Sequence, residues 1–154
     1  MSKRIWIVGI AALAAASGLA VASGTATRAH GKFTDVDSTR REGGIWRIGV
    51  LTRTRNGNTR EIDVVQAAAR NLDVSGATAS NPPSFHVYLV TSDSSTSADF
   101  GKMRVNRHGK GGFMFDTRFG STLPSGVTSL STFSGGTIEI HDGSGTVVLS
   151  ATLP

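Results

Sequence analysis

Apolar and polar residues alternate over short stretches after residue 32, and turn residues separate these stretches. Alternation with a period of two places every second side chain on the same face of a β-strand. Strands are therefore predicted over residues 45–53, 60–65, 85–91, 102–107, 113–117, 137–141 and 146–153. About seven to eight short strands at close spacing are typical of an antiparallel β-sandwich. The sequence predicts one all-β sandwich domain over residues 33–154.

The first hairpin is marked by Asn56-Gly57, a dipeptide that favours tight turns because both residues tolerate positive φ. The register depends on the length of the loop around it. A three-residue loop centred on Gly57 would place Val50 opposite Val64 and Thr52 opposite Ile62. That register keeps the apolar sides of the two strands together, and we predict it for this hairpin.

The alternation also predicts which side chains form the interior. Aromatic and large aliphatic residues recur on one face of each predicted strand, and burying each contributes about 1.5–3 kcal/mol. The predicted core is Trp46, Ile48, Val50, Ile62, Val64, Phe85, Val87, Leu89, Met103, Val105, Phe113, Phe115, Ile138, Ile140, Val147 and Leu149.

The first 22 residues have the pattern of a secretory signal peptide. Lys3 and Arg4 form a positive start, residues 5–21 form an apolar run, and Ala20 and Ala22 supply the small residues that a signal peptidase needs. Cleavage is predicted before Ser23; the alternative is that the run is retained as a membrane anchor. Residues 23–32 are small, polar and basic without periodicity, and they predict a flexible lead-in.

Composition narrows the compartment and the chemistry. The 154-residue chain contains no cysteine, so disulfides and thiol catalysis are excluded, and we expect a bacterial protein exported to the periplasm or beyond. The formal charge of +5 falls to +3 if Lys3 and Arg4 leave with the signal. Such a mildly basic domain suits either an ordinary soluble surface or contact with anionic envelope polymers. No second apolar stretch of spanning length follows, so no membrane span is expected after cleavage.

The C-terminal half, roughly residues 84–154, resembles short exported β-domain proteins of environmental bacteria. The resemblance implies a secreted all-β domain and supplies no catalytic residues. It rests on Asp116-Thr117-Arg118, Gly120, Leu123-Pro124, Gly126-Val127, Gly135-Gly136, Ile138-Glu139-Ile140, Asp142, residues 145–149 and Leu153-Pro154.

Arginines are concentrated around the first hairpin. Guanidinium groups bind phosphates and carboxylates through two parallel hydrogen bonds, so such a group can hold an acidic polymer. Glu42, Glu61 and Asp63 lie nearby and offer the alternative of cross-strand ion pairs on a solvated face. No aromatic residues are interleaved with these arginines, which argues against specific nucleic-acid binding. The candidate anion-binding residues are Arg47, Arg53, Arg55 and Arg60, with Arg40 and Arg41 just before them.

The four histidines are the only candidate imidazole ligands for a metal: His30, His86, His108 and His141. No two of them have the spacing that puts two ligands on one helix face. If cleavage instead fell after Ala29, His30 would become the N-terminus, whose amine and imidazole can bind copper as in copper-dependent polysaccharide oxygenases. This copper enzyme is the alternative to a protein without a cofactor.

Carboxylates near residue 37 allow the alternative of a calcium site. Asp35, Asp37 and Glu42 are close in sequence, as calcium ligands are. Their spacing departs from a calcium loop, and Arg40 and Arg41 follow directly, so a polar loop is the favoured interpretation.

No pattern for nucleophilic catalysis is present. Ser144 lacks the glycine spacing of a nucleophile elbow, and the glycines at 109–112 lack the Ser or Thr that follows a phosphate-loop lysine. We therefore expect no cofactor and a non-enzymatic binding or structural module of the cell envelope. The further alternative is a self-associating β subunit that pairs through residues 23–32 or an open edge strand.

Overall fold

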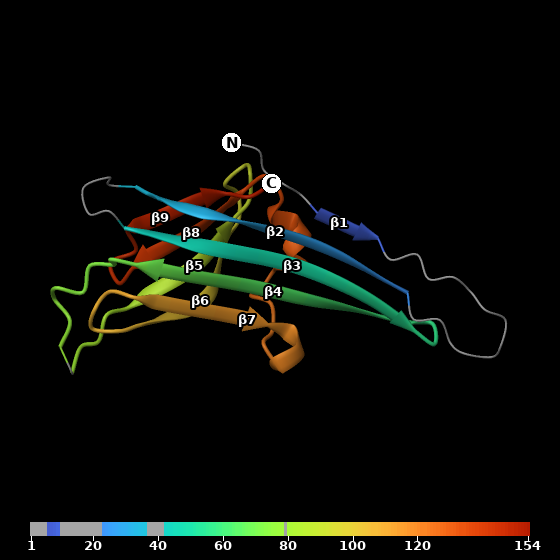
Figure 1. Ribbon diagram of the computed structural model, residues 1–154, viewed down its shortest axis with the longest axis horizontal. Coiled ribbons are helices and arrows are strands. Elements are labelled where there is room, and N and C mark those ends of the chain that lie inside the picture. Colours follow the sequence, from blue (N-terminus) through green and yellow to red (C-terminus); the bar gives the residue numbers. More distant parts are fainter. Residues whose placement is uncertain (1–5, 10–22, 37–41, 79) are drawn as a thin grey trace.

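The computed structural model describes residues 6–9, 23–36, 42–78 and 80–154, and these form strands and two short 3-10 turns without an α-helix (Figure 1). The described chain contains no helix with the length and hydrophobicity that a bilayer crossing requires. The elements are β1 (Trp6–Gly9), β2 (Ser23–Asp35), β3 (Gly43–Arg55), β4 (Asn58–Arg70), β5 (Phe85–Val90), β6 (Ser97–Val105), β7 (Gly111–Asp116), η1 (Thr117–Phe119), η2 (Leu130–Phe133), β8 (Thr137–Asp142) and β9 (Val147–Thr152).

The strands close into an eight-stranded antiparallel barrel rather than the predicted sandwich. The order is β2-β3-β4-β7-β6-β5-β8-β9, and closure comes from Thr34 and Asp35 of β2, which pair with Ser150 and Leu149 of β9. β6 joins the two halves because its first part pairs with β5 and its end pairs with β7. The all-β class is confirmed. The sandwich is wrong because β2 and β6 each pair with strands of both sheets and so join the two sheets into one closed sheet.

β2 contains residues 23–32, for which the composition predicts a flexible lead-in. These residues pair with β3 along almost their whole length. Their inward positions are small, and at Gly31 a Cβ would lie 2.7 Å from the Trp46 ring, so the indole occupies the space that a side chain would need. The strand is stabilised by this cross-strand packing and not by an apolar pattern of its own, which explains why periodicity does not reveal it.

β1 lies inside the predicted signal peptide and pairs with residues 25–28 of β2. The predicted cleavage site at Ala22 and residues 10–22 as a whole lie outside the described residues. The signal peptide therefore stays a prediction.

The β3–β4 hairpin has a two-residue turn, so the predicted three-residue register is wrong. Asn56 and Gly57 have φ of 52° and 76°, and Arg55 pairs with Asn58. Val50 consequently pairs with Asp63 and not with Val64. A shift of one residue reverses every side chain of a strand. The odd-numbered residues of β4 therefore face the interior.

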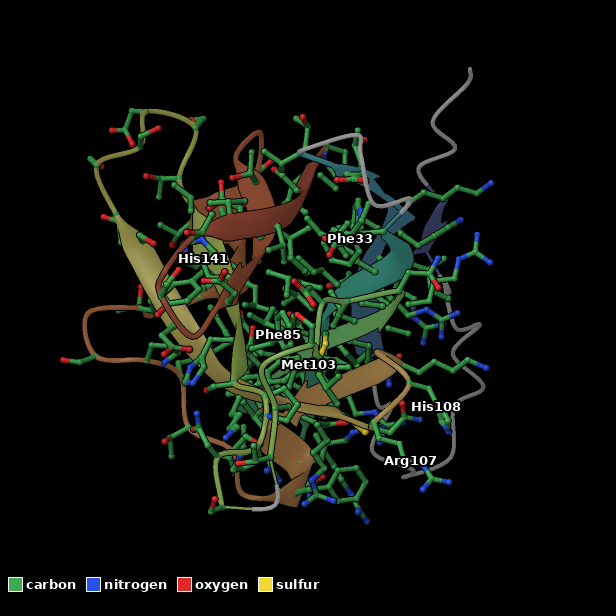
Figure 2. The ribbon with its side chains drawn as sticks, turned by 90° about the vertical axis from the view of Figure 1, so that its left-hand side faces the viewer. Phe33, Phe85, Met103, Arg107, His108 and His141 are labelled. Atoms are coloured by element: carbon green, nitrogen blue, oxygen red, sulfur yellow. The ribbon has the colours of Figure 1, made fainter. Side chains whose placement is uncertain are left out.

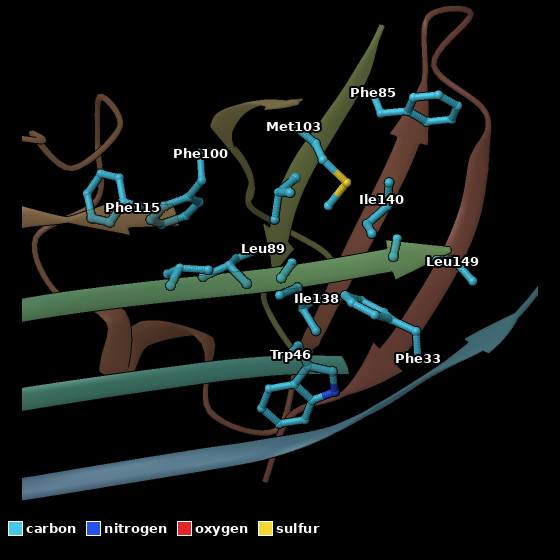
Figure 3. Packing of buried hydrophobic residues seen from close by; sticks show 14 of the residues in the cluster. Phe33, Trp46, Phe85, Leu89, Phe100, Met103, Phe115, Ile138, Ile140 and Leu149 are labelled. Atoms are coloured by element: carbon cyan, nitrogen blue, oxygen red, sulfur yellow. The ribbon is translucent and has the colours of Figure 1, made fainter. Parts of the chain in front are cut away.

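Most of the predicted core is confirmed, and the register of β3 and β4 accounts for the exceptions on β4 (Figure 3). Trp46, Phe115 and Leu149 are buried in one cluster, whereas Val65 replaces Val64 on the inner face of β4. Ile62 is buried but lies outside that cluster, and Val147 is only half-buried. The core residues that the alternation does not identify are Phe33, Val65, Ala67, Ala69, Leu72, Ala98, Phe100, Leu130, Phe133 and Leu153.

Phe115 offers a direct test of this interior. It is 5% exposed and meets Phe100 edge to face, with ring centroids 5.1 Å apart. We expect Phe115→Ala to lower the free energy of unfolding by about 3–5 kcal/mol, because it leaves a cavity in the core. Met114→Ala on the adjacent, 56% exposed position should cost about 1 kcal/mol or less. Denaturant unfolding measures both, and equal effects would contradict the inward assignment of Phe115.

Candidate functional site

Six exposed cationic side chains share the outer surface of β2, β3 and residues 58–69 of β4, and Arg70 stands at the end of the same surface. The register places the odd residues of β2 and the even residues of β3 inward, so their alternate residues face out. Figure 2 shows nitrogen-ended side chains gathered on the outer side of these strands. We call this surface the cationic face, and its members are Arg28, Lys32, Arg47, Arg53, Arg55 and Arg60.

All four arginines predicted from the sequence lie on the cationic face, but they fall into two groups. Arg53 and Arg60 are direct cross-strand partners near the hairpin turn, and Arg55 lies beside them. Arg47 is six residues along β3, about 20 Å away at 3.4 Å per residue. Its partner across β2 is His30. Arg40 and Arg41 lie outside the described residues.

Arg28 and Lys32 belong to the cationic face, although the sequence analysis does not single them out. Each lies two residues along β2 from His30, opposite Gly49 and Ile45 respectively. The sequence pattern that indicates their shared face is the alternation of basic residues with small ones in residues 27–32. Hydrophobic periodicity does not identify such a segment, because its inward residues are small and not strongly apolar.

The nearby carboxylates do not neutralise this face. Asp63 is 4% exposed and stands opposite Val50 on the inner side of β4, and Glu61 accepts a hydrogen bond from Ser129 Oγ at 2.7 Å. Glu42 is also buried. Among the described residues, neither Glu61 nor Asp63 forms an ion pair with any of the six cations. The alternative of cross-strand ion pairs between these acids and arginines is therefore wrong for Glu61 and Asp63.

Like charges that face each other across two strands are unfavourable. Arg53 and Arg60 are in this arrangement, and their neighbours at the turn add no negative charge. A bound anion would relieve this repulsion, since guanidinium groups pair with phosphate, sulfate-like and carboxylate oxygens in the same way. The chemistry available on the cationic face is therefore the binding of oxyanions.

A second polar group lies on the outer surface of β5, β6 and β8. His86 and His141 are cross-strand partners. His86 Nδ1 lies 2.8 Å from Asp99 Oδ2, and His141 Nε2 lies 2.8 Å from Glu139 Oε2. Tyr88 stacks on His141 with ring centroids 4.2 Å apart. Burial raises the pKa of Tyr88, and the charge of Asp99, to which its hydroxyl donates, raises it further.

The structure does not bring the four histidines into one metal site. His86 and His141 meet, but each already contacts a carboxylate. His108 contacts Arg107, and Figure 2 shows this pair on a different side of the barrel from His141. His30 lies within β2. In the described ranges, no group of three or more His, Asp or Glu side chains is arranged to hold a metal. Asp37, one of the candidate calcium ligands, lies outside those ranges.

An ion pair between buried Asp116 and exposed Arg118 fixes the end of β7. Asp116 is 2% exposed and accepts hydrogen bonds from Arg118 N at 2.8 Å and from Arg118 Nε at 3.0 Å. These contacts lower the pKa of Asp116, although burial acts against them. Next to it, Thr117 Oγ1 accepts a hydrogen bond from Asp63 N. The pair therefore anchors η1 against β4.

Comparison with protein-family models, curated proteins and solved structures found no match to this chain. Support for a function therefore comes from the cationic face itself.

The Asp116 ion pair gives a prediction about pH. Because the pKa of Asp116 is lowered on folding, its contribution is full above the unfolded value of about 4 and is lost as pH falls through the lower folded value. Arg118→Gln should reduce the denaturant midpoint at pH 7, and the difference from wild type should shrink below about pH 4. Arg107→Gln is the matched control on a surface turn. A difference that stays constant from pH 7 to 3 would contradict the role of the ion pair.

Proposed function

We propose that this protein is an exported, non-enzymatic module of a bacterial cell envelope that binds anionic polymers through the cationic face. The proposal rests on one observation: six cations share one outer surface, while Glu61 and Asp63 of the same hairpin are turned inward. The leader-like residues 1–22 support export.

The dimensions of the face favour an extended polymer over a single small anion. The turn group and the group around Arg47 are separated by about 20 Å along β3. A single phosphate can occupy one group only, whereas a chain with repeating acidic groups can contact both. Multiple weak contacts along one chain also strengthen one another through their high effective concentration.

Self-association through residues 23–32 receives less support. These residues already pair with β3, and residues 25–28 also pair with β1. Pairing of Thr34 and Asp35 with β9 also covers the C-terminal end of the β2 edge, which would otherwise accept a neighbour. The copper alternative depends on a chain that begins at His30, and it stays a prediction.

Heparin, as a model polyanion, tests the cationic face. We expect the protein to be retained on immobilised heparin at low salt and released as ionic strength screens the contacts. Arg53→Gln/Arg60→Gln should elute at lower salt, and its log affinity should depend on log salt with a slope shallower by about two, since two contacts are lost.

Arg104→Gln/Arg107→Gln is the control, because it removes the same charge from exposed positions outside the cationic face. This variant should elute close to wild type. Equal losses in the two double variants would indicate attraction to net charge alone and would overturn the proposed site. Purified lipopolysaccharide in place of heparin extends the test to an envelope polymer.

A further inference from the structure

A cavity of about 270 Å³ opens near the hairpin end of the barrel, on the inner side of β2 and β3. Its walls come from Ala29, Ile48 and Val50 on the strands and from Leu130 and Phe133 of η2. Phe133 is 1% exposed and packs edge-on against Phe100, with ring centroids 6.0 Å apart, so this wall is held by the core. The volume is just below the range of about 300–1,000 Å³ for small-molecule sites.

The polar groups at this mostly apolar cavity are oxygens. Glu61 lines it and accepts a hydrogen bond from the Ser129 hydroxyl, and the Ser131 hydroxyl also donates to Ser129 Oγ. Two serines are therefore already engaged with one another and with Glu61. The carboxylate of Glu61 has further lone pairs that can accept a hydrogen bond.

A second, independent observation concerns Asp63, which lies behind the cavity. It projects inward from β4, two residues from Glu61 on the same face and opposite the lining residue Val50. Its Oδ1 is buried and accepts no hydrogen bond from the described residues. A buried acceptor without a partner is costly, so such atoms in folded proteins call for a donor.

Burial raises the pKa of Asp63, and the charge of Glu61 together with a hydrogen bond between the two carboxyl groups raises it further, while the backbone N–H of Leu130 acts in the opposite direction. The buried carboxyl of Asp63 and the exposed carboxylate of Glu61 are thus neighbours, and among the described residues neither forms an ion pair with a cation. A bound ammonium group would relieve this repulsion and supply donors to both sides of the site.

We propose that the cavity binds a small amphipathic amine, with its apolar part against Ile48, Val50 and Phe133 and its ammonium group on Glu61. This site is separate from the cationic face. The two have opposite charge preferences because β3 and β4 direct arginines outward and carboxylates inward. An anionic amphiphile is disfavoured in the cavity by the same carboxylates that favour the amine.

Octylamine is the probe, and octanoate is its matched control because it carries the opposite charge on a similar chain. Isothermal titration of the full chain at pH 7 should show octylamine binding about tenfold or more tightly than octanoate. Glu61→Gln should weaken octylamine binding by about tenfold or more and narrow its preference over octanoate. Glutamine keeps a side-chain oxygen that can accept a hydrogen bond from the Ser129 hydroxyl, so this variant retains the local hydrogen bond.

Ala29→Leu fills the apolar wall and should weaken both ligands, while Arg53→Gln/Arg60→Gln should leave octylamine affinity unchanged. Circular dichroism melts establish that each variant is folded. Absence of octylamine binding to wild type, equal binding of octanoate, or unchanged affinity in folded Glu61→Gln would overturn the proposal. Failure of heparin retention would bear on the cationic face alone.

Discussion

The register of the β3–β4 hairpin is the constraint on which the surface and the interior both depend. Asn56 and Gly57 adopt positive φ, and the two-residue turn pairs Arg55 with Asn58. Because strand side chains alternate, this single choice fixes the side of every later residue in β4. A turn longer by one residue would move Val65 out of the core and place Asp63 among the arginines.

Charge separation across one sheet is the main consequence of that register. The outer side of β2, β3 and β4 carries arginine and lysine, and the inner side of β4 carries Glu61 and Asp63 near the end of the barrel. Ion pairing across the strands would have cancelled both groups. Their separation instead leaves an outer surface that favours oxyanions and a cavity that favours cations, so the two sites need not compete for one ligand.

The sequence predicted the strand content well, because alternation in β5, β8 and the first half of β3 reflects true burial. It failed for residues 23–32, where threonine, alanine and glycine face inward and the strand depends on Trp46 from its neighbour. It also failed at the first hairpin. Both candidate registers there bury apolar residues, since Ile62 and Val64 compete with Val65 and Ala67, and hydrophobicity alone does not separate them.

The candidate site was predicted in part for the same reason. Arg47, Arg53 and Arg55 alternate within one strand, so their common face follows from sequence, whereas Arg28 and Lys32 required the pairing of β2 with β3. The cavity could not be foreseen. It depends on η2 packing against β3, and no local pattern in residues 130–133 encodes that contact.

Barrel closure carries a kinetic consequence. Thr34 pairs with Ser150, so the last seam joins segments near opposite ends of the domain. The pairings β4–β7 and β5–β8 also join strands that are not consecutive, whereas the remaining pairings join neighbours in the chain. Such non-local pairings slow folding, since the entropy of bringing remote segments together is lost before the contacts form. Until β9 is synthesised, β2 keeps an unpaired strand edge at residues 34–35. A nascent chain emerging in order would hold that edge open throughout translation.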